Sequence, residues 1–285
     1  MDLSIVIVSW NTKDLVDQCL NSIYKETNKI NFEIFLVDNN SHDKTVEMVQ
    51  EKYPNVILIA NKNNLGFAYA NNQALKQSKG KYVLVLNPDT IILNNSLDKA
   101  IEIMDKEDEA TAILGARTYN KNMTQQKTVW SDPLLLAQIF LLTKIKYIFP
   151  KSKTIKKYRR TDFDYTKKTY VDQIQGSFML IRNEVMKKLN YFDENFFIWF
   201  EEVDLCYRTR NTGYKILYSP DVEIIHLGGE SFKQVMTIKK QRMYNRSLFY
   251  YFKKNKPRWQ YFILRLFEIP SLILALLAGL IKRIK

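Results

Sequence analysis

The sequence predicts an α/β fold with a mainly parallel sheet, helices on both faces and a helical segment at the C-terminal end. Short β-branched runs alternate with helical stretches through the first 115 residues, which is typical of repeated strand–helix units. The runs 5–8 and 82–86 are apolar at every position, as strands covered on both faces should be. With 285 residues and 46% hydrophobic side chains the chain can build a core, which excludes intrinsic disorder.

The expected elements follow from this alternation. Between about 116 and 170 the pattern loosens, which indicates a variable surface or substrate-facing insertion. Outside this stretch the sequence predicts strands at 3–9, 32–37, 56–60, 81–86, 175–182, 214–218 and 222–226. It predicts helices near 12–26, 43–52, 66–78 and 95–106, a short helix after 182 and another helix from about residue 200.

The positive charge is concentrated near the C-terminal end. The formal net charge is +13, but residues 231–285 hold 13 Lys and Arg against the single Glu268, so residues 1–230 are nearly neutral. A neutral body with a basic, apolar end favours an anionic membrane surface over nucleic acid as the partner. We therefore expect 1–230 to be the catalytic domain and 231–285 a helical tail that associates with a membrane.

The apolar part of this tail is short. Residues 269–281 are uncharged, whereas a spanning helix needs about 20 apolar residues, so we expect the segment to lie in the membrane interface with Trp259 and Tyr261 at headgroup depth. A buried helix, or a hairpin with the stretch that starts at Tyr261, is the alternative. The first strand follows Met1 and Asp2 directly and both cysteines resemble reduced core residues, so we expect a cytoplasmic protein, peripheral on the inner face of the cell membrane.

Polar side chains stand where three predicted strands end. Ser9 closes the first strand, Asp38 follows the second and Asn87 follows the fourth. In open α/β sheets ligands bind beyond these carboxyl ends. The carboxylate of Asp38 can accept the N–H of a uracil- or thymine-type base, and Asp89 can supply one of the one or two protein carboxylates that a divalent cation on a diphosphate needs. Helix capping and a type I turn are the alternative roles.

Adjacent carboxylates stand in an aromatic part of the sequence. If a helix begins near Phe200, Glu201 and Glu202 point about 100° apart, so that one of them can face a cleft. Close carboxylates beside apolar walls raise one another's pKa, which suits a general base that takes a hydroxyl proton. For Asp204 we favour an ion pair on the helix surface with Arg208, four residues further on.

Eight motifs occur in order over about residues 3–231, and together they resemble the family-2 inverting glycosyltransferases of the GT-A fold, in the rhamnosyltransferase-like branch. Each motif alone is weak, but the series is specific for the family. The motifs are VIVSWN at 6–11, VDNNSHD at 37–43, NNLGFAYANN at 63–72, LNPD at 86–89, GSFMLIR at 176–182, FDENFF at 192–197, EEVDLCYR at 201–208 and His226.

The resemblance implies a nucleotide-diphospho-sugar donor bound in the crevice. Asp38 would bind the base, and Ser9, Asn64, Asn72 and Asn87 would line the donor site. It also implies a hydroxyl acceptor on a cell-surface glycan precursor. An amphiphilic acceptor such as a polyprenyl-diphosphate-linked saccharide would explain the basic, apolar tail.

The resemblance further implies a divalent metal, Mg²⁺ or Mn²⁺. Asn87 and Asp89 match the Asp-x-Asp metal motif of the family, and His226 matches its third metal ligand. Because Asn87 replaces the first Asp of that motif, the alternative is a catalytically impaired, membrane-associated protein that binds a nucleotide-sugar.

The general base is also assigned from the resemblance. Glu202 occupies the position at which the family commonly carries its catalytic Asp, while Glu201 and Asp204 stay as alternatives. Residues 255–259 do not match the Gln-x-x-Arg-Trp signature of processive members, which indicates that one sugar is added.

Overall fold

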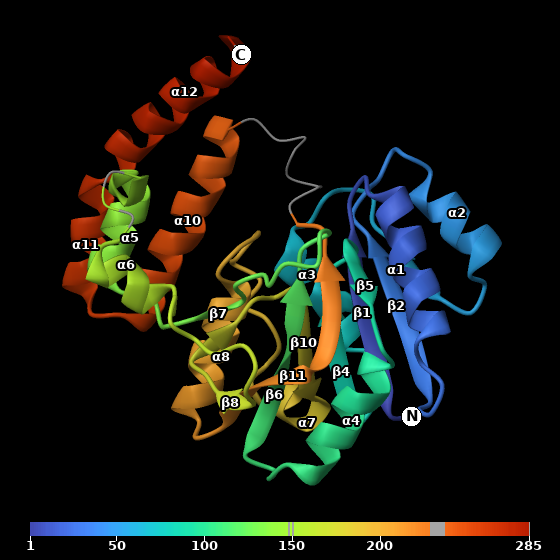
Figure 1. The fold of residues 1–285 in the computed structure, drawn as a ribbon. Helices are drawn as coiled ribbons and strands as arrows, with labels where there is room; N and C mark the ends of the chain where they lie inside the picture. The colour runs from blue at the N-terminus through green and yellow to red at the C-terminus, as the bar shows by residue number, and fades with distance from the viewer. Residues whose placement is uncertain (148, 150, 229–236, 285) are drawn as a thin grey trace.

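The computed structural model describes residues 1–285 except 148, 150, 229–236 and 285 (Figure 1). Within the described residues a nine-stranded sheet has the order β3-β2-β1-β4-β10-β6-β11-β5, with β8 paired to β11, and β7 and β9 form a separate pair. The strands are β1 Leu3–Ser9, β2 Phe32–Asp38, β3 Ile57–Ala60, β4 Tyr82–Leu86, β5 Thr90–Ile92, β6 Thr111–Tyr119, β7 Val129–Trp130, β8 Thr169–Tyr170, β9 Gln173–Ile174, β10 Phe178–Arg182 and β11 Lys215–His226.

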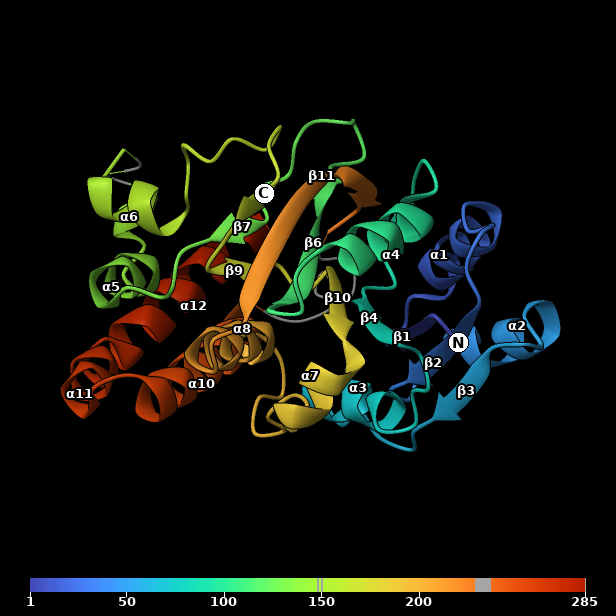
Figure 2. The ribbon, with the colours of Figure 1, turned by 90° about the horizontal axis from the view of Figure 1, so that it is seen from below.

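Helices cover both faces of the sheet, with α1 and α4 on one face and α3, α7 and α8 on the other (Figure 2). This confirms the predicted α/β class. The helices are α1 Lys13–Lys25, α2 Thr45–Lys52, α3 Phe67–Leu75, α4 Ser96–Lys106, α5 Leu135–Leu142, α6 Lys153–Tyr158, α7 Asn183–Lys188, α8 Glu201–Asn211, α10 Thr237–Asn255, α11 Arg258–Leu266 and α12 Glu268–Ile284, with a 3₁₀ turn at Ile145–Tyr147.

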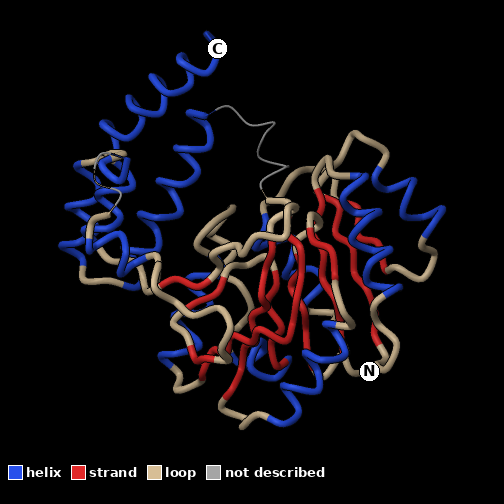
Figure 3. Tube along the Cα trace, viewed as in Figure 1, coloured by secondary structure: helices blue, strands red, loops and turns tan. Residues whose placement is uncertain are grey.

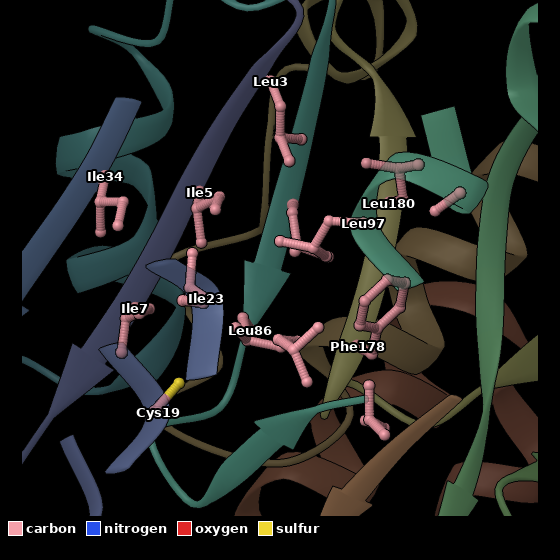
Figure 4. Close-up of a cluster of buried hydrophobic side chains, with 14 of the residues drawn as sticks. Leu3, Ile5, Ile7, Cys19, Ile23, Ile34, Leu86, Leu97, Phe178 and Leu180 are labelled. Atoms are coloured by element: carbon pink, nitrogen blue, oxygen red, sulfur yellow. The ribbon is translucent and has the colours of Figure 1, made fainter. Parts of the chain in front are cut away.

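Strand alternation explains the two cores. Successive side chains of a strand point to opposite faces, so Ile5 and Ile7 pack with residues of α1 such as Ile23 (Figure 4). Val6 and Val8 pack against the other helix layer. Cys19 lies in the first of these cores, and Cys206 lies in the second. Both are buried free thiols, as predicted.

The strands predicted in the first 90 residues are confirmed, but the sheet differs from the prediction further along the chain. β10 runs antiparallel to both β4 and β6, and β6 is a central strand that was not predicted. The expected strand pair 214–218 and 222–226 is wrong, because β11 continues through both segments. Pro220 has no N–H for the ladder, and the register of β11 against β6 shifts between Ser219 and Glu223 instead of the chain turning back.

The C-terminal helices form a group with two helices from the middle of the chain (Figure 3). α12 packs against α10 and α5, and α11 packs against α10 and α5. A third hydrophobic core joins this group to the start of α8, since Phe200 and Val203 pack there with Leu248, Phe252 and Leu264. The predicted boundary at residue 230 falls outside the described residues, and the two predicted parts share this core.

No helix of the described chain is by itself long and apolar enough to cross a membrane. α11 and the residues 268–279 of α12, which are bent by 42° relative to one another, pass the length and composition test only as a pair.

Candidate active site

A cavity of about 1220 Å³ lies at the carboxyl ends of the parallel strands β1, β4 and β11. These strands end at the same edge of the sheet, which is where ligands bind in α/β proteins. Seven of the ten predicted site residues line it, namely Ser9, Asn64, Asn87, Asp89, Glu201, Glu202 and His226.

Asp89 and His226 face one another in this cavity. The His226 Nε2 atom lies 3.2 Å from Asp89 Oδ1, and the Nδ1 atom lies 2.8 Å from Gln126 Oε1. The Gln126 amide donates to Asn120 Oδ1 and to the His226 carbonyl, so its Oε1 is left to accept the Nδ1–H of the imidazole. In the neutral ring Nε2 then turns a lone pair toward the carboxylate. A proton or a cation between these two atoms would remove the repulsion.

The Asp89–His226 pair fits a divalent cation that takes further ligands from its substrate. In the described part of the chain no group of three or more His, Cys, Asp or Glu side chains could hold a metal. One carboxylate, one imidazole and the oxygens of a diphosphate are nevertheless a common set, because such cations are often held by one or two carboxylates plus phosphates. Gln126 orients the imidazole as an outer ligand partner does. It lies in the loosely patterned stretch, where no sequence signal marks it.

Glu201 and Glu202 form a second acidic pair in the same cavity. Burial raises the pKa of Glu201 well above its ordinary value, and the neighbouring Glu202 carboxylate raises it further. Burial also raises the pKa of Glu202. One oxygen of each, Oε2, is buried without a hydrogen-bond partner in the described structure. Both carboxyl groups thus have a raised pKa, as expected for neighbouring acids in a buried place.

Gly66 allows the segment before α8 to pack closely against α3. A Cβ atom on Gly66 would lie 2.6 Å from the Phe197 carbonyl oxygen, and the φ of +86° at Gly66 also favours glycine. The N–H of Phe67 donates to the same oxygen at 2.7 Å. Gly66 of the NNLGF motif thus lets the segment that precedes the acidic pair lie directly against the start of α3, and the backbone of Gly176 lies close to the side chain of Glu202.

Asp38 and Asn72 lie outside the lining of the cavity. The Oδ2 atom of Asp38 accepts the N–H of Ser41 at 2.8 Å, while its Oδ1 is buried without a partner. The Asn72 amide donates to Phe192 O and Glu194 Oε1, and its oxygen accepts the N–H of Phe192. These bonds hold the loop after α7 against α3, which leaves the Asn72 amide occupied.

Asp204 also has a different place from the predicted one. Its carboxylate is fully buried and pairs with Arg208 Nε at 2.7 Å and Lys254 Nζ at 2.9 Å. The Asn255 amide donates to it at 2.8 Å. The predicted pair with Arg208 exists, but it lies in the interior between α8 and α10 instead of on a helix surface. Two cations thus hold the Asp204 carboxylate, which does not line the cavity.

The family model for glycosyl transferase family 2 matches residues 4–189. An N-acetylglucosaminyl-diphospho-decaprenol L-rhamnosyltransferase of Mycobacterium tuberculosis is 25% identical over 235 residues, covering 79% of this chain and 75% of that protein. The rhamnosyltransferase WbbL of Escherichia coli is 26% identical over 231 residues, covering 78% of this chain and 82% of that protein.

Solved structures show the same fold. A mannosyltransferase from Pyrobaculum calidifontis, in complex with GDP-Man and Mn²⁺, superposes with a TM-score of 0.60 at 16% identity, covering 97% of this chain and 74% of that one. The predicted GT-A fold is thereby confirmed.

Proposed function

The chain belongs to glycosyl transferase family 2, and from this premise we propose that it moves one sugar from a nucleotide-diphospho-sugar, dTDP-rhamnose or a UDP-sugar, to a hydroxyl of a lipid-linked glycan precursor. The observation that carries the proposal is that one cavity holds both the Asp89–His226 pair and the Glu201–Glu202 pair. The two named relatives support the sugar, and the decaprenol in the name of one of them supports the lipid-linked acceptor.

Glu202 is the general base of the proposed reaction. Its carboxylate removes the proton of the acceptor hydroxyl, and the oxygen attacks the anomeric carbon from the face opposite the diphosphate. The bond between that carbon and the diphosphate oxygen breaks, so the configuration inverts and a nucleoside diphosphate leaves. Burial keeps the pKa of Glu202 raised, which increases its affinity for the proton.

Asp89 and His226 would hold Mg²⁺ or Mn²⁺, with Asn87 beside them. The cation, when bound, neutralises charge on the diphosphate as it leaves. Asn87 brings no charge to this site, so the oxygens of the donor are needed for tight binding. Ser9 and Asn64 line the same part of the cavity and would contact the donor. Asp38, which precedes the lining residue Asn39, would bind the nucleobase of the donor.

The direct test is a screen of dTDP- and UDP-sugars with Mn²⁺ and a lipid-linked saccharide acceptor. We expect release of the nucleoside diphosphate that requires both the acceptor and the metal. Binding of a donor with no turnover on any acceptor would favour the alternative, a nucleotide-sugar binding protein that has lost catalysis. Failure to bind any nucleotide-sugar would contradict both functions.

We further propose that the C-terminal tail, predicted at 231–285, docks the enzyme on an anionic bilayer, at the cytoplasmic face of the cell membrane. Leu266 is 75% exposed and Ile269 is 70% exposed, where α11 meets α12. Trp259 and Phe262 are also exposed on α11, and Glu268 is the one acidic residue of this part of the sequence. Exposed apolar side chains with flanking aromatics and cations are typical of helices that lie in a membrane interface.

Replacing both Leu266 and Ile269 with Gln should weaken binding to vesicles that contain anionic lipid by at least about 10-fold, because each side chain contributes roughly 1.5–3 kcal/mol when it leaves water. Co-sedimentation with the vesicles measures this affinity. Ile57→Gln on β3 is the matched control, since Ile57 is exposed at the other end of the sheet. Equal binding of the double variant and the control would contradict the docking face. Point variants are preferable to deletion because Leu264 of α11 lies in the shared core.

A further inference from the structure

We propose that Lys144, Arg159 and Lys240 form an anion site in the cavity wall that binds the diphosphate group of a polyprenyl-diphosphate-linked acceptor. The inference rests on the proposed function and specifies its acceptor. It assigns a second diphosphate site, separate from the one that Asp89 and His226 serve for the donor.

The three cations come from different elements and line one cavity. Lys144 follows α5, Arg159 follows α6, and Lys240 lies in the first turn of α10. Lys144 Nζ donates to Gln241 Oε1 at 2.9 Å, which ties the end of α5 to α10. Three segments far apart in the sequence thus bring positive charge to the same wall.

Arg159 has unused hydrogen-bonding capacity at this wall. Its guanidinium stacks 5.6 Å from the centre of the Trp130 ring, and its Nε atom is buried without a hydrogen-bond partner. Among the described residues no carboxylate pairs with Arg159 or with Lys240. Guanidinium and ammonium groups in such positions are common ligands of phosphate oxygens, and a diphosphate would supply the missing acceptors.

The wall lies close to the proposed base. Tyr158, Arg159 and Glu202 line the same cavity, and burial together with the Glu202 carboxylate raises the pKa of Tyr158 to about 12. Tyr244 of α10 packs against Phe200, directly before the acidic pair, with the two ring centroids 5.5 Å apart. Because the base removes the acceptor proton, the acceptor must lie on the Glu202 side of the cavity, and this is the cationic side.

The same helices connect the wall to the exposed apolar face. α5 and α10 supply cavity residues on one side, and they pack against α11 and α12 on the other. Leu266 and Ile269 are exposed on those outer helices. A lipid chain in the bilayer beneath this face could therefore extend its diphosphate to the wall, with the saccharide reaching Glu202.

The test measures binding without donor or metal, so it does not depend on glycosyl transfer. The probe is farnesyl diphosphate in a chelating buffer, and the readout is tryptophan fluorescence, since Trp130 and Trp199 line the cavity. We expect Arg159→Gln and Lys240→Gln each to weaken binding about 10-fold or more, as loss of a charged hydrogen bond does. Arg242→Gln, on α10 but outside the cavity lining, is the matched control and should bind like the wild type.

Three comparisons decide the assignment. Farnesol should bind at least about 10-fold more weakly than farnesyl diphosphate, and saturating UDP should not displace the diphosphate probe. Inorganic pyrophosphate should also bind more weakly than farnesyl diphosphate, and equal affinity would overturn the lipid assignment.

Displacement of the probe by UDP would overturn the site. Unchanged binding of the probe by both the Arg159 and Lys240 variants, with normal thermal unfolding, would overturn it as well. If transfer is later observed, the Arg159 variant should raise KM for the lipid acceptor and leave KM for the donor unchanged.

Discussion

Glu202→Gln should lower kcat by about 10²–10⁴-fold while the nucleotide donor binds as before, because glutamine keeps the shape of the side chain and cannot take a proton. The wild-type rate should rise with pH through the raised pKa of Glu202, since below it the carboxyl is protonated and cannot act as a base. The variant should lose this limb of the pH profile. Steady-state kinetics from pH 5 to 9, with donor affinity from calorimetry, would measure both effects.

Two neighbouring carboxylates provide the controls. Glu201→Gln imitates the protonated form that burial favours, so it should keep kcat within about 10-fold of the wild type. It should also stabilise the fold at neutral pH by roughly 1 kcal/mol or more, because a carboxyl whose pKa is raised by folding contributes stability only at low pH and loses it as the pH rises. If the Glu201 variant lost most of its kcat while the Glu202 variant stayed active, Glu201 would be the general base instead of Glu202.

Asp204→Asn should act on stability instead of on the chemistry. It leaves Arg208 and Lys254 without their buried partner, which should lower the free energy of unfolding by about 2–4 kcal/mol. The fraction of the variant that stays folded should still show a rate that rises with pH as in the wild type. Glu102→Gln, in an exposed ion pair with Lys106, is the comparison and should leave the free energy of unfolding almost unchanged, because solvent screens an exposed pair.

Asp89→Ala should reduce kcat/KM by about 10³-fold or more and abolish the dependence of the rate on Mn²⁺. The reason is that Asp89 is the one carboxylate beside His226 in the described cavity wall, so without it His226 alone of this pair would hold the cation that neutralises the departing diphosphate. Titration of activity with Mn²⁺, together with binding of the metal in the presence of UDP, would measure it.

Asn87→Asp is the informative partner of that variant. It adds a carboxylate close to His226 Nε2, where the Asn87 amide now lies at 3.4 Å, so half-maximal activity should need less Mn²⁺. The metal assignment would be contradicted if the wild type were fully active in chelator, or if Asp89→Ala kept its response to Mn²⁺.

The sheet was predictable where neighbouring strands are also neighbours in the sequence. The first four strands alternate with helices, and the fully apolar runs at 5–8 and 82–86 indicate burial on both faces. β6 was missed because Gly115 and Arg117 interrupt its apolar pattern and its partners β10 and β11 lie far along the chain. The antiparallel direction of β10 likewise depends on its pairing with β4, and the local sequence does not indicate that pairing.

The candidate site was predictable where a motif stands at the end of a strand. Ser9, Asp89 and His226 come together because β1, β4 and β11 end at one edge. Asn72 and Asp204 have the right chemistry, but distant segments occupy their hydrogen bonds, and residue type alone does not reveal that. The cationic wall could not be predicted, since its members belong to separate segments without a shared motif.

The core that joins Phe200 and Val203 to Leu248, Phe252 and Leu264 bears on how such enzymes could be recombined. Phe200 and Val203 flank the acidic pair on the chain, so the core that holds these carboxylates in place also holds the last helices. A chimera that exchanges only the C-terminal helices with those of a relative would bring foreign partners to Phe200 and displace Glu202. A chimera designed to change the acceptor should therefore exchange the segment 196–203 together with the helices against which it packs.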